Sequence, residues 1–315
     1  MRASRYLGAV LGGVMAVALA GCGSSASGPG TAGAGPSAAG STGSGAAAPL
    51  SVVTSTNVYG DIVRQIAGDR ATVTALISNP DADPHEFEAS AHDQLELSRA
   101  DLVVENGGGY DDFVGAMLTA SGRDITVLDA VDISGKSAEK GAELNEHVWY
   151  DLPSMITLVD TIGTALGTLD PAGADTFSAN AADLRSQIRT LQDTASAIAA
   201  AHRGAGVAIT EPVPLYLLQA CGLRNRTPEE FSEAIEEGID VPALVLQHTL
   251  DLFSGGTVAL LVYNEQTGGP QTDRVLKAAR SHDIPVVPVT ETLPAGQDYQ
   301  GWMADNLAAI GTALG

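Results

Sequence analysis

Two histidines and two glutamates follow predicted β-strands or precede helices, and their side chains suit a metal ion. His85 lies in an acidic, proline-rich segment after a β-rich run, and His147 lies between a strand and a capped helix. Glu211 and Glu291 each follow a strand-like run in the second half of the chain. Imidazole nitrogens and carboxylate oxygens together suit a divalent ion such as zinc, manganese or iron. The four side chains are therefore candidate metal ligands.

Each of these residues, taken alone, also has a simpler interpretation. His85 fits a solvated acidic loop, and His147 beside Trp149 fits a packed surface histidine. Glu211 fits an acid in the first turn of a helix, where the helix dipole favours negative charge. Glu291 fits a solvated loop acid. Only their shared placement in the predicted fold favours a metal site, because open α/β sheets bind ligands at the carboxyl ends of their strands.

Strand-like and helix-like runs alternate in both halves of the folded chain, which predicts βαβ units and parallel sheets. The first half predicts strands at 51–53, 71–77, 101–104 and 124–128, and helices at 57–67, 90–99, 110–120 and 153–167. The second half predicts strands at 207–210, 258–262 and 284–289, and helices at 211–220, 240–253, 272–281 and 299–314.

One long helix is predicted over 171–203, because its apolar residues recur at alternating spacings of four and three. About 30 residues at a rise of 1.5 Å give a length of about 45 Å. Such a helix can join two lobes as a rigid connection, or it can be an ordinary packing helix inside one domain. We predict an α/β fold of two βα lobes, residues 50–170 and 204–315, joined by this helix.

The first residues predict a lipoprotein leader. Residues 1–21 carry a charged start and a short apolar run, and they end at the cleavage box Leu19-Ala20-Gly21-Cys22. An ordinary secretory cleavage site is the alternative. Lipid on Cys22 would hold the protein at the extracytoplasmic face of the cell membrane without spanning it. Residues 22–49 are nearly all Gly, Ser, Ala, Thr and Pro, so we expect a flexible tether.

Composition limits the classes of ligand. The formal net charge is −22, which argues against nucleic acid because phosphate binding needs basic patches. The charge is compatible with a cation as ligand, or simply with solubility. With Cys22 lipidated, Cys221 is the only other cysteine, so no internal disulfide is expected and Cys221 is predicted to be a core residue.

Two segments resemble a known family. They read Asp-Pro-His-Glu-Phe-Glu at 83–88 and Glu-His-Val-Trp-Tyr-Asp-Leu-Pro at 146–153. With the lipoprotein box and the long central helix, they resemble the metal-binding lipoproteins of ABC importers. That family includes zinc and manganese receptors and the adhesin lipoproteins. The resemblance implies two α/β lobes joined by a rigid helix, with the metal site between the lobes.

The resemblance also implies a ligand set. The first two ligands of the family fall on His85 and His147. The third falls on Glu211, a position that holds histidine in many zinc receptors and glutamate in many manganese or iron receptors. The fourth is commonly an aspartate in a turn after the last strand, and here that turn carries Glu291 instead. The implied cargo is one divalent ion, zinc or manganese and possibly iron. The absence of histidine from the loop before Glu146 leans toward manganese or iron.

The implied function is that of an extracytoplasmic, monomeric substrate-binding lipoprotein that delivers metal to an ABC permease and its ATPase. Such a protein is not an enzyme. An adhesin-type lipoprotein without transport is one alternative. A metallohydrolase is a weaker one, because it would need an open coordination position and a general base. Glu86 and Glu88 are candidates for that base only by their proximity to His85.

Overall fold

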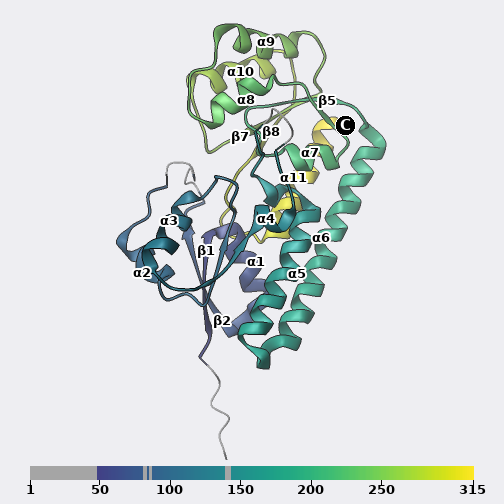
Figure 1. The fold of residues 1–315 in the computed structure, drawn as a ribbon. Coiled ribbons are helices and arrows are strands. Elements are labelled where there is room, and N and C mark those ends of the chain that lie inside the picture. Colours follow the sequence, from purple (N-terminus) through teal and green to yellow (C-terminus); the bar gives the residue numbers. More distant parts are fainter. Residues whose placement is uncertain (1–47, 81–83, 85–86, 139–142) are drawn as a thin grey trace, which may run out of the picture. The chain divides into compact units, whose positions relative to one another are not determined.

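Two four-stranded parallel sheets form the framework of Ala47–Gly315, which make up one compact unit in this computed structural model (Figure 1). The structure describes residues 48–80, 84, 87–138 and 143–315. The predicted leader, the lipidation site Cys22, most of the tether and His85 lie outside the described residues. The predicted fold class, two parallel-sheet α/β lobes with one long helix, is confirmed.

The N-terminal lobe is built on a sheet of strand order β2-β1-β3-β4. Its strands are β1 (Leu50–Thr56), β2 (Ala71–Ile77), β3 (Leu102–Glu105) and β4 (Thr126–Asp129). Its helices are α1 (Asn57–Ala67), α2 (Ala91–Leu97), α3 (Asp112–Ser121), α4 (Ala130–Ser134) and α5 (Leu152–Leu169). Val52 and Val104 face the core formed with α1 and α5, while Val53 and Val103 face α2 and α3. Both faces are therefore covered, as a parallel sheet requires.

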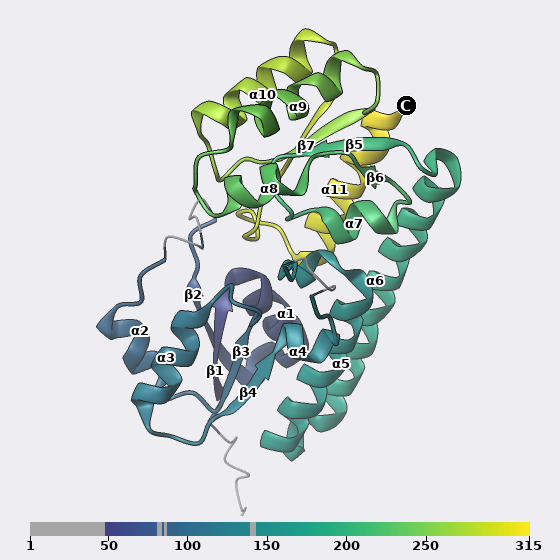
Figure 2. The same ribbon diagram turned by 45° about the horizontal axis from the view of Figure 1, so that its top comes forward.

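The C-terminal lobe repeats this plan with strand order β6-β5-β7-β8. Its strands are β5 (Gly206–Ile209), β6 (Arg224–Asn225), β7 (Leu260–Asn264) and β8 (Val286–Val289). Its helices are α7 (Leu215–Ala220), α8 (Glu229–Glu236), α9 (Ala243–Ser254), α10 (Pro270–Ser281) and α11 (Tyr299–Leu314). In Figure 2, α8, α9 and α10 lie together, while α7 and α11 lie beside the long helix.

The long helix is α6 (Ala174–His202), and a short 3₁₀ turn at Pro171–Gly173 precedes it. Its 29 residues correspond to a length of about 43 Å. Its buried stripe belongs to a single hydrophobic cluster that also contains Val52 of the first sheet and Val262 of the second. The two lobes thus share one core along α6. The exact domain boundaries stay a prediction.

Within the described residues, α5 is the helix that is long and apolar enough to cross a membrane. Its buried residues include Met155 and Ile162, and it packs along α6 in both views of the ribbon. Asp151 caps it by accepting a hydrogen bond from the backbone N–H of Ser154. We therefore assign α5 to the core of the N-terminal lobe.

The predicted helix 211–220 is wrong at its start. α7 begins only at Leu215, because Pro212 and Pro214 interrupt the segment. A proline disfavours helical backbone in the residue before it, so Glu211 lies in a turn ahead of the helix. Cys221 is fully buried, as expected for a core residue, and burial raises the pKa of its thiol to about 12.

Truncating the shared core along α6 should destabilise the protein. Leu184 on α6 is 2% exposed and Leu244 on α9 is 67% exposed. We expect Leu184→Ala to lower the free energy of unfolding by about 2–5 kcal/mol. The matched change Leu244→Ala should alter it by no more than about 0.5 kcal/mol. Urea titration followed by circular dichroism measures both, and equal effects would contradict the packing assigned to α6.

Candidate metal centre

Three polar side chains gather where neighbouring strands of the second sheet end. Asn264 is the last residue of β7, Glu211 lies two residues after β5, and Glu291 lies two residues after β8. Because β5, β7 and β8 are adjacent and parallel, their carboxyl ends meet at one edge of the sheet. Glu211 is 2% exposed and Glu291 is 1% exposed. The fold therefore buries two carboxylates side by side.

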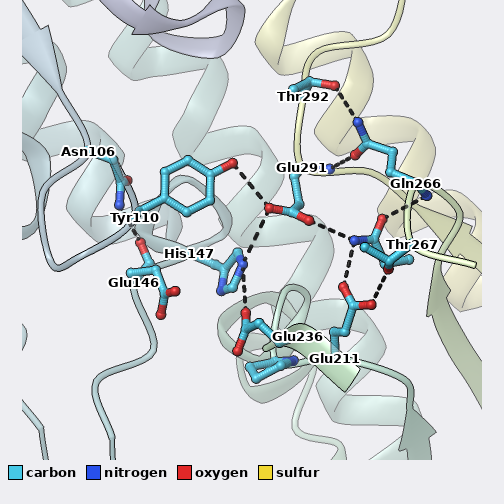
Figure 3. Close-up of polar contacts among 12 residues, drawn as sticks. Asn106, Tyr110, Glu146, His147, Glu211, Glu236, Gln266, Thr267, Glu291 and Thr292 are labelled. Carbon is cyan, nitrogen blue, oxygen red and sulfur yellow. Dashed lines mark hydrogen bonds and ion pairs between the residues drawn. The ribbon is translucent and has the colours of Figure 1, made fainter. Parts of the chain in front are cut away.

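The amide of Asn264 links these two carboxylates. Its Nδ2 donates one hydrogen bond to Glu211 Oε2 at 2.6 Å and another to Glu291 Oε1 at 2.7 Å. The Thr267 hydroxyl donates to Glu211 Oε1, and Gln266 Oε1 accepts the backbone N–H of Glu291 at 2.5 Å. Figure 3 shows these contacts around the two glutamates. Fixed donors thus hold both carboxylates in place.

His147 approaches the carboxylates from the N-terminal lobe. It is fully buried and directly precedes a 3₁₀ turn at Val148–Tyr150. Its Nδ1 lies 2.8 Å from Asn145 Oδ1, an oxygen that also accepts the backbone N–H of His147 at 3.1 Å. An amide oxygen only accepts, so Nδ1 carries the proton of the neutral ring. The lone pair is then on Nε2, the nitrogen that a metal would bind.

His147 Nε2 faces two carboxylates of the C-terminal lobe (Figure 3). Glu236 Oε1 lies 3.2 Å from it and Glu291 Oε2 lies 3.8 Å from it. Tyr110 donates its phenolic hydrogen to Glu291 Oε2 at 3.1 Å. The rings of Tyr110 and Trp149 also lie beside the imidazole, with centroids 6.0 and 5.0 Å away. The site is therefore polar at its centre and walled by aromatic rings.

The electrostatics of the site reflect burial and crowding of acids. Burial by itself lowers the pKa of His147, but the nearby carboxylates of Glu291 and Glu236 raise it, and the net pKa lies above its ordinary value. The pKa of Glu211 is raised to about 7, chiefly by burial and also by the charge of Glu291, while the hydrogen bonds from Thr267 and Asn264 oppose the rise. A positive charge bound between these residues would lower the pKa of both His147 and Glu211.

Three of the four predicted ligands come together, and the fourth lies outside the described residues. His147, Glu211 and Glu291 all belong to the cluster, whereas the structure gives no position for His85. The carbonyl oxygen of Pro80, five residues earlier, accepts hydrogen bonds from Thr292 Oγ1 at 2.8 Å and from Gln266 Nε2 at 3.1 Å. The segment that leads to His85 therefore starts beside the Glu291 turn.

The remaining histidines lie in positions that suit a solvent-facing or structural role. His92, His248 and His282 are exposed, and His202 is half-buried at the end of α6.

Sequence reasoning assigned no role in the site to Asn264, Glu236 or Glu146. Asn264 follows the predicted strand 258–262 by two residues and is the last residue of β7, so its position after a strand was a usable signal. Glu236 ends α8, a helix that was not predicted, and its sequence neighbours Glu233 and Glu237 are also acidic. No motif distinguishes it, and only the fold brings it to His147.

The buried imidazole of His147 and the carboxylates of Glu211, Glu236 and Glu291 can hold a divalent cation. Their combined negative charge needs a counter-ion, and mixed nitrogen and oxygen ligands suit zinc, manganese and iron. The ligand atoms of Glu146, His147 and Glu236 all lie within 4.8 Å of one another. The arrangement therefore supports binding of a metal ion.

The chain matches a known protein family. The model of the family described as "Zinc-uptake complex component A periplasmic" matches residues 52–313. A manganese-binding lipoprotein MntA of Halalkalibacterium halodurans is 26% identical over 245 residues, which cover 70% of this chain and 80% of that protein.

A further relative and a solved structure match different shares of the chain. The manganese ABC transporter substrate-binding lipoprotein PsaA of Streptococcus pneumoniae serotype 4 is 31% identical over 143 residues, 42% of this chain and 45% of that protein. The chain thus matches less than half the length of that relative. The solved structure of the FpvC substrate-binding protein from Pseudomonas aeruginosa in complex with Mn²⁺ has a TM-score of 0.70 and 26% identity. It covers 84% of this chain and 98% of that one.

A second acidic group lies at the end of β3, outside the cluster. The pKa of Glu105 is raised to about 7, chiefly by burial and also by the negative charges of Asp111 and Asp129. The ordinary value is 4.5, so the folded state holds this proton more tightly than the unfolded chain does. The protonated carboxyl of Glu105 therefore contributes fully to the stability of the folded state below pH 4.5, and this contribution is lost as the pH rises through 7.

Replacing Glu105 by glutamine should remove this dependence. In chelator-treated protein we expect Glu105→Gln to match the wild type in urea unfolding midpoint near pH 4.5 and to exceed it at pH 8. The exposed Glu88→Gln is the control, and it should show no gain that grows with pH. A Glu105→Gln midpoint below the wild type at pH 8 would contradict the assigned burial of its charge.

Proposed function

The chain belongs to the family of the periplasmic zinc-uptake component A, the substrate-binding proteins of metal ABC importers, and we propose the ligands, cargo and anchoring of this member. The cargo is one divalent transition metal. The ligands are His147 from the N-terminal lobe, Glu211 and Glu291 from the C-terminal lobe, and His85 from the segment after β2. The observation that carries the proposal is the meeting of buried His147 and buried Glu291, which come from different lobes.

The proposed cargo is manganese or iron(II), with zinc as the competing ion. The cluster supplies more carboxylate oxygen than imidazole nitrogen. Carboxylates suit manganese, whereas zinc binds tightly to many sites of this kind and ranks above manganese in intrinsic affinity. Selection would then depend on geometry and on the supply of each metal. The MntA and PsaA relatives are named for manganese, which supports the same choice.

The proposed setting is the extracytoplasmic face of the cell membrane. Lipid on Cys22 anchors the chain, and residues 22–49 act as the tether. About 27 residues of flexible chain give a root-mean-square reach of about 26–31 Å. A monomer can therefore carry metal over this distance to its permease, which works with an ATPase.

Family membership favours a transport receptor over the two alternatives. An adhesin-type lipoprotein without transport would have no use for a buried cluster of ligands shared between lobes. A metallohydrolase would need an open coordination position with a water to activate. The four proposed ligands, two imidazoles and two carboxylates, would close the coordination shell and leave no such position.

Metal content tests the proposal directly. Protein that starts at Ala47 is stripped with chelator and loaded with equal amounts of zinc, manganese and iron(II) without oxygen. We expect one equivalent of metal by elemental analysis. We also expect His147→Gln or Glu211→Gln to weaken binding by more than about 100-fold, because even the partners that orient metal ligands are worth about 10–100-fold.

The matched control is His248→Gln, which changes an exposed histidine on α9 and should keep wild-type affinity. His85→Gln completes the series and tests the ligand that the described residues leave open. Failure of the wild type to retain any of the three metals would contradict the proposed function.

A further inference from the structure

Glu236 lies against the metal centre although no sequence pattern pointed to it. It is the last residue of α8, in the C-terminal lobe, and its side chain is 13% exposed. Its Oε1 is 3.2 Å from Nε2 of the fully buried His147, closer than the 3.8 Å between Nε2 and Glu291 Oε2. Figure 3 shows Glu236 on the opposite side of the imidazole from Tyr110.

The separation between Glu236 and His147 suits two ligands of one ion. A zinc-like ion bonds nitrogen and oxygen at about 2.0–2.2 Å, so neighbouring ligand atoms lie about 3.0–3.6 Å apart. The Oε1–Nε2 distance of 3.2 Å falls in this range. Because Nδ1 of the ring is directed at Asn145, Nε2 is the nitrogen left for the metal. An ion on Nε2 would therefore contact Glu236.

Glu236 also borders a cavity of about 670 Å³ between the two lobes. Six glutamates line this cavity: Glu143, Glu146, Glu229, Glu233, Glu236 and Glu237. None of the described residues that line it is a lysine or an arginine. Clustered negative charge with low-dielectric walls raises the local concentration of cations. Glu236 thus reaches both the acidic cavity and the buried imidazole.

We propose that Glu236 is a further metal-binding residue, which receives the divalent cation from the acidic cavity and coordinates it together with His147. This inference rests on the proposed function. It adds a ligand from α8 to those at the strand ends, and it makes the cavity the route by which the ion reaches the site. The alternative is that Glu236 only pairs with the imidazole when no metal is present.

The test compares two glutamates that are neighbours in sequence and line the same cavity. In protein starting at Ala47, the dissociation constants for Mn²⁺ and Zn²⁺ are measured at 0.15 M salt by competition with a fluorescent chelator. We expect Glu236→Gln to weaken Mn²⁺ binding by at least about tenfold. The control Glu237→Gln removes the same charge from an exposed position, and it should weaken binding by no more than about threefold, as for a screened surface charge.

The outcomes separate this inference from the proposed function. If the wild type binds neither metal, the proposed function fails, and this inference fails with it. If the wild type binds metal and Glu236→Gln has the same affinity as Glu237→Gln, or a higher one, only the inference is overturned. Should Glu236→Gln not fold, Glu236→Asp keeps the charge but shortens the side chain, and wild-type affinity in that variant would overturn the inference.

Discussion

The interaction on which this structure depends is the meeting of a buried imidazole with buried carboxylates from the other lobe. His147, Glu211 and Glu291 have almost no contact with solvent. Hydrogen bonds from Asn264 and Tyr110 stabilise the carboxylates, but neutral donors leave their charge in place. Burying such charge is costly unless it is paired. A divalent cation is the partner that satisfies the imidazole lone pair and the acids together.

The rest of the fold holds these groups at fixed positions. Each lobe covers its parallel sheet on both faces, and the lobes share one hydrophobic cluster along α6. Polar contacts also join the lobes around the site: Tyr150 donates to Thr290 O at 2.7 Å, and Tyr299 donates to Trp149 O at 2.7 Å. Since both bonds lie within a few residues of His147 or Glu291, buried contacts rather than surface loops set the distance between these two candidate ligands.

Much of the fold could be predicted from sequence, because local signals and the fold agree there. Helix α1 and strand β2 have the predicted bounds, as does the final helix α11. The cap of Asp151 on α5 was also a local signal. The start of α7 and the existence of α8 could not be predicted so well, because prolines and a run of acids obscured the helical pattern. Glu211 and Glu291 were candidates because predicted strand ends mark sites in α/β folds, and His147 was a candidate from its motif. Glu236 was not, because its proximity to His147 arises only from packing.

The most direct test of the account is a crystal structure of the manganese-loaded protein with anomalous diffraction. The account predicts one strong anomalous peak within about 2.0–2.4 Å of His147 Nε2 and of carboxylate oxygens of Glu211 and Glu291, at distances typical of nitrogen and oxygen ligands to such ions. The same map would show whether His85 completes the ligand set. A peak elsewhere on the protein, with the His147 and Glu291 side chains unchanged and no ion between them, would contradict it.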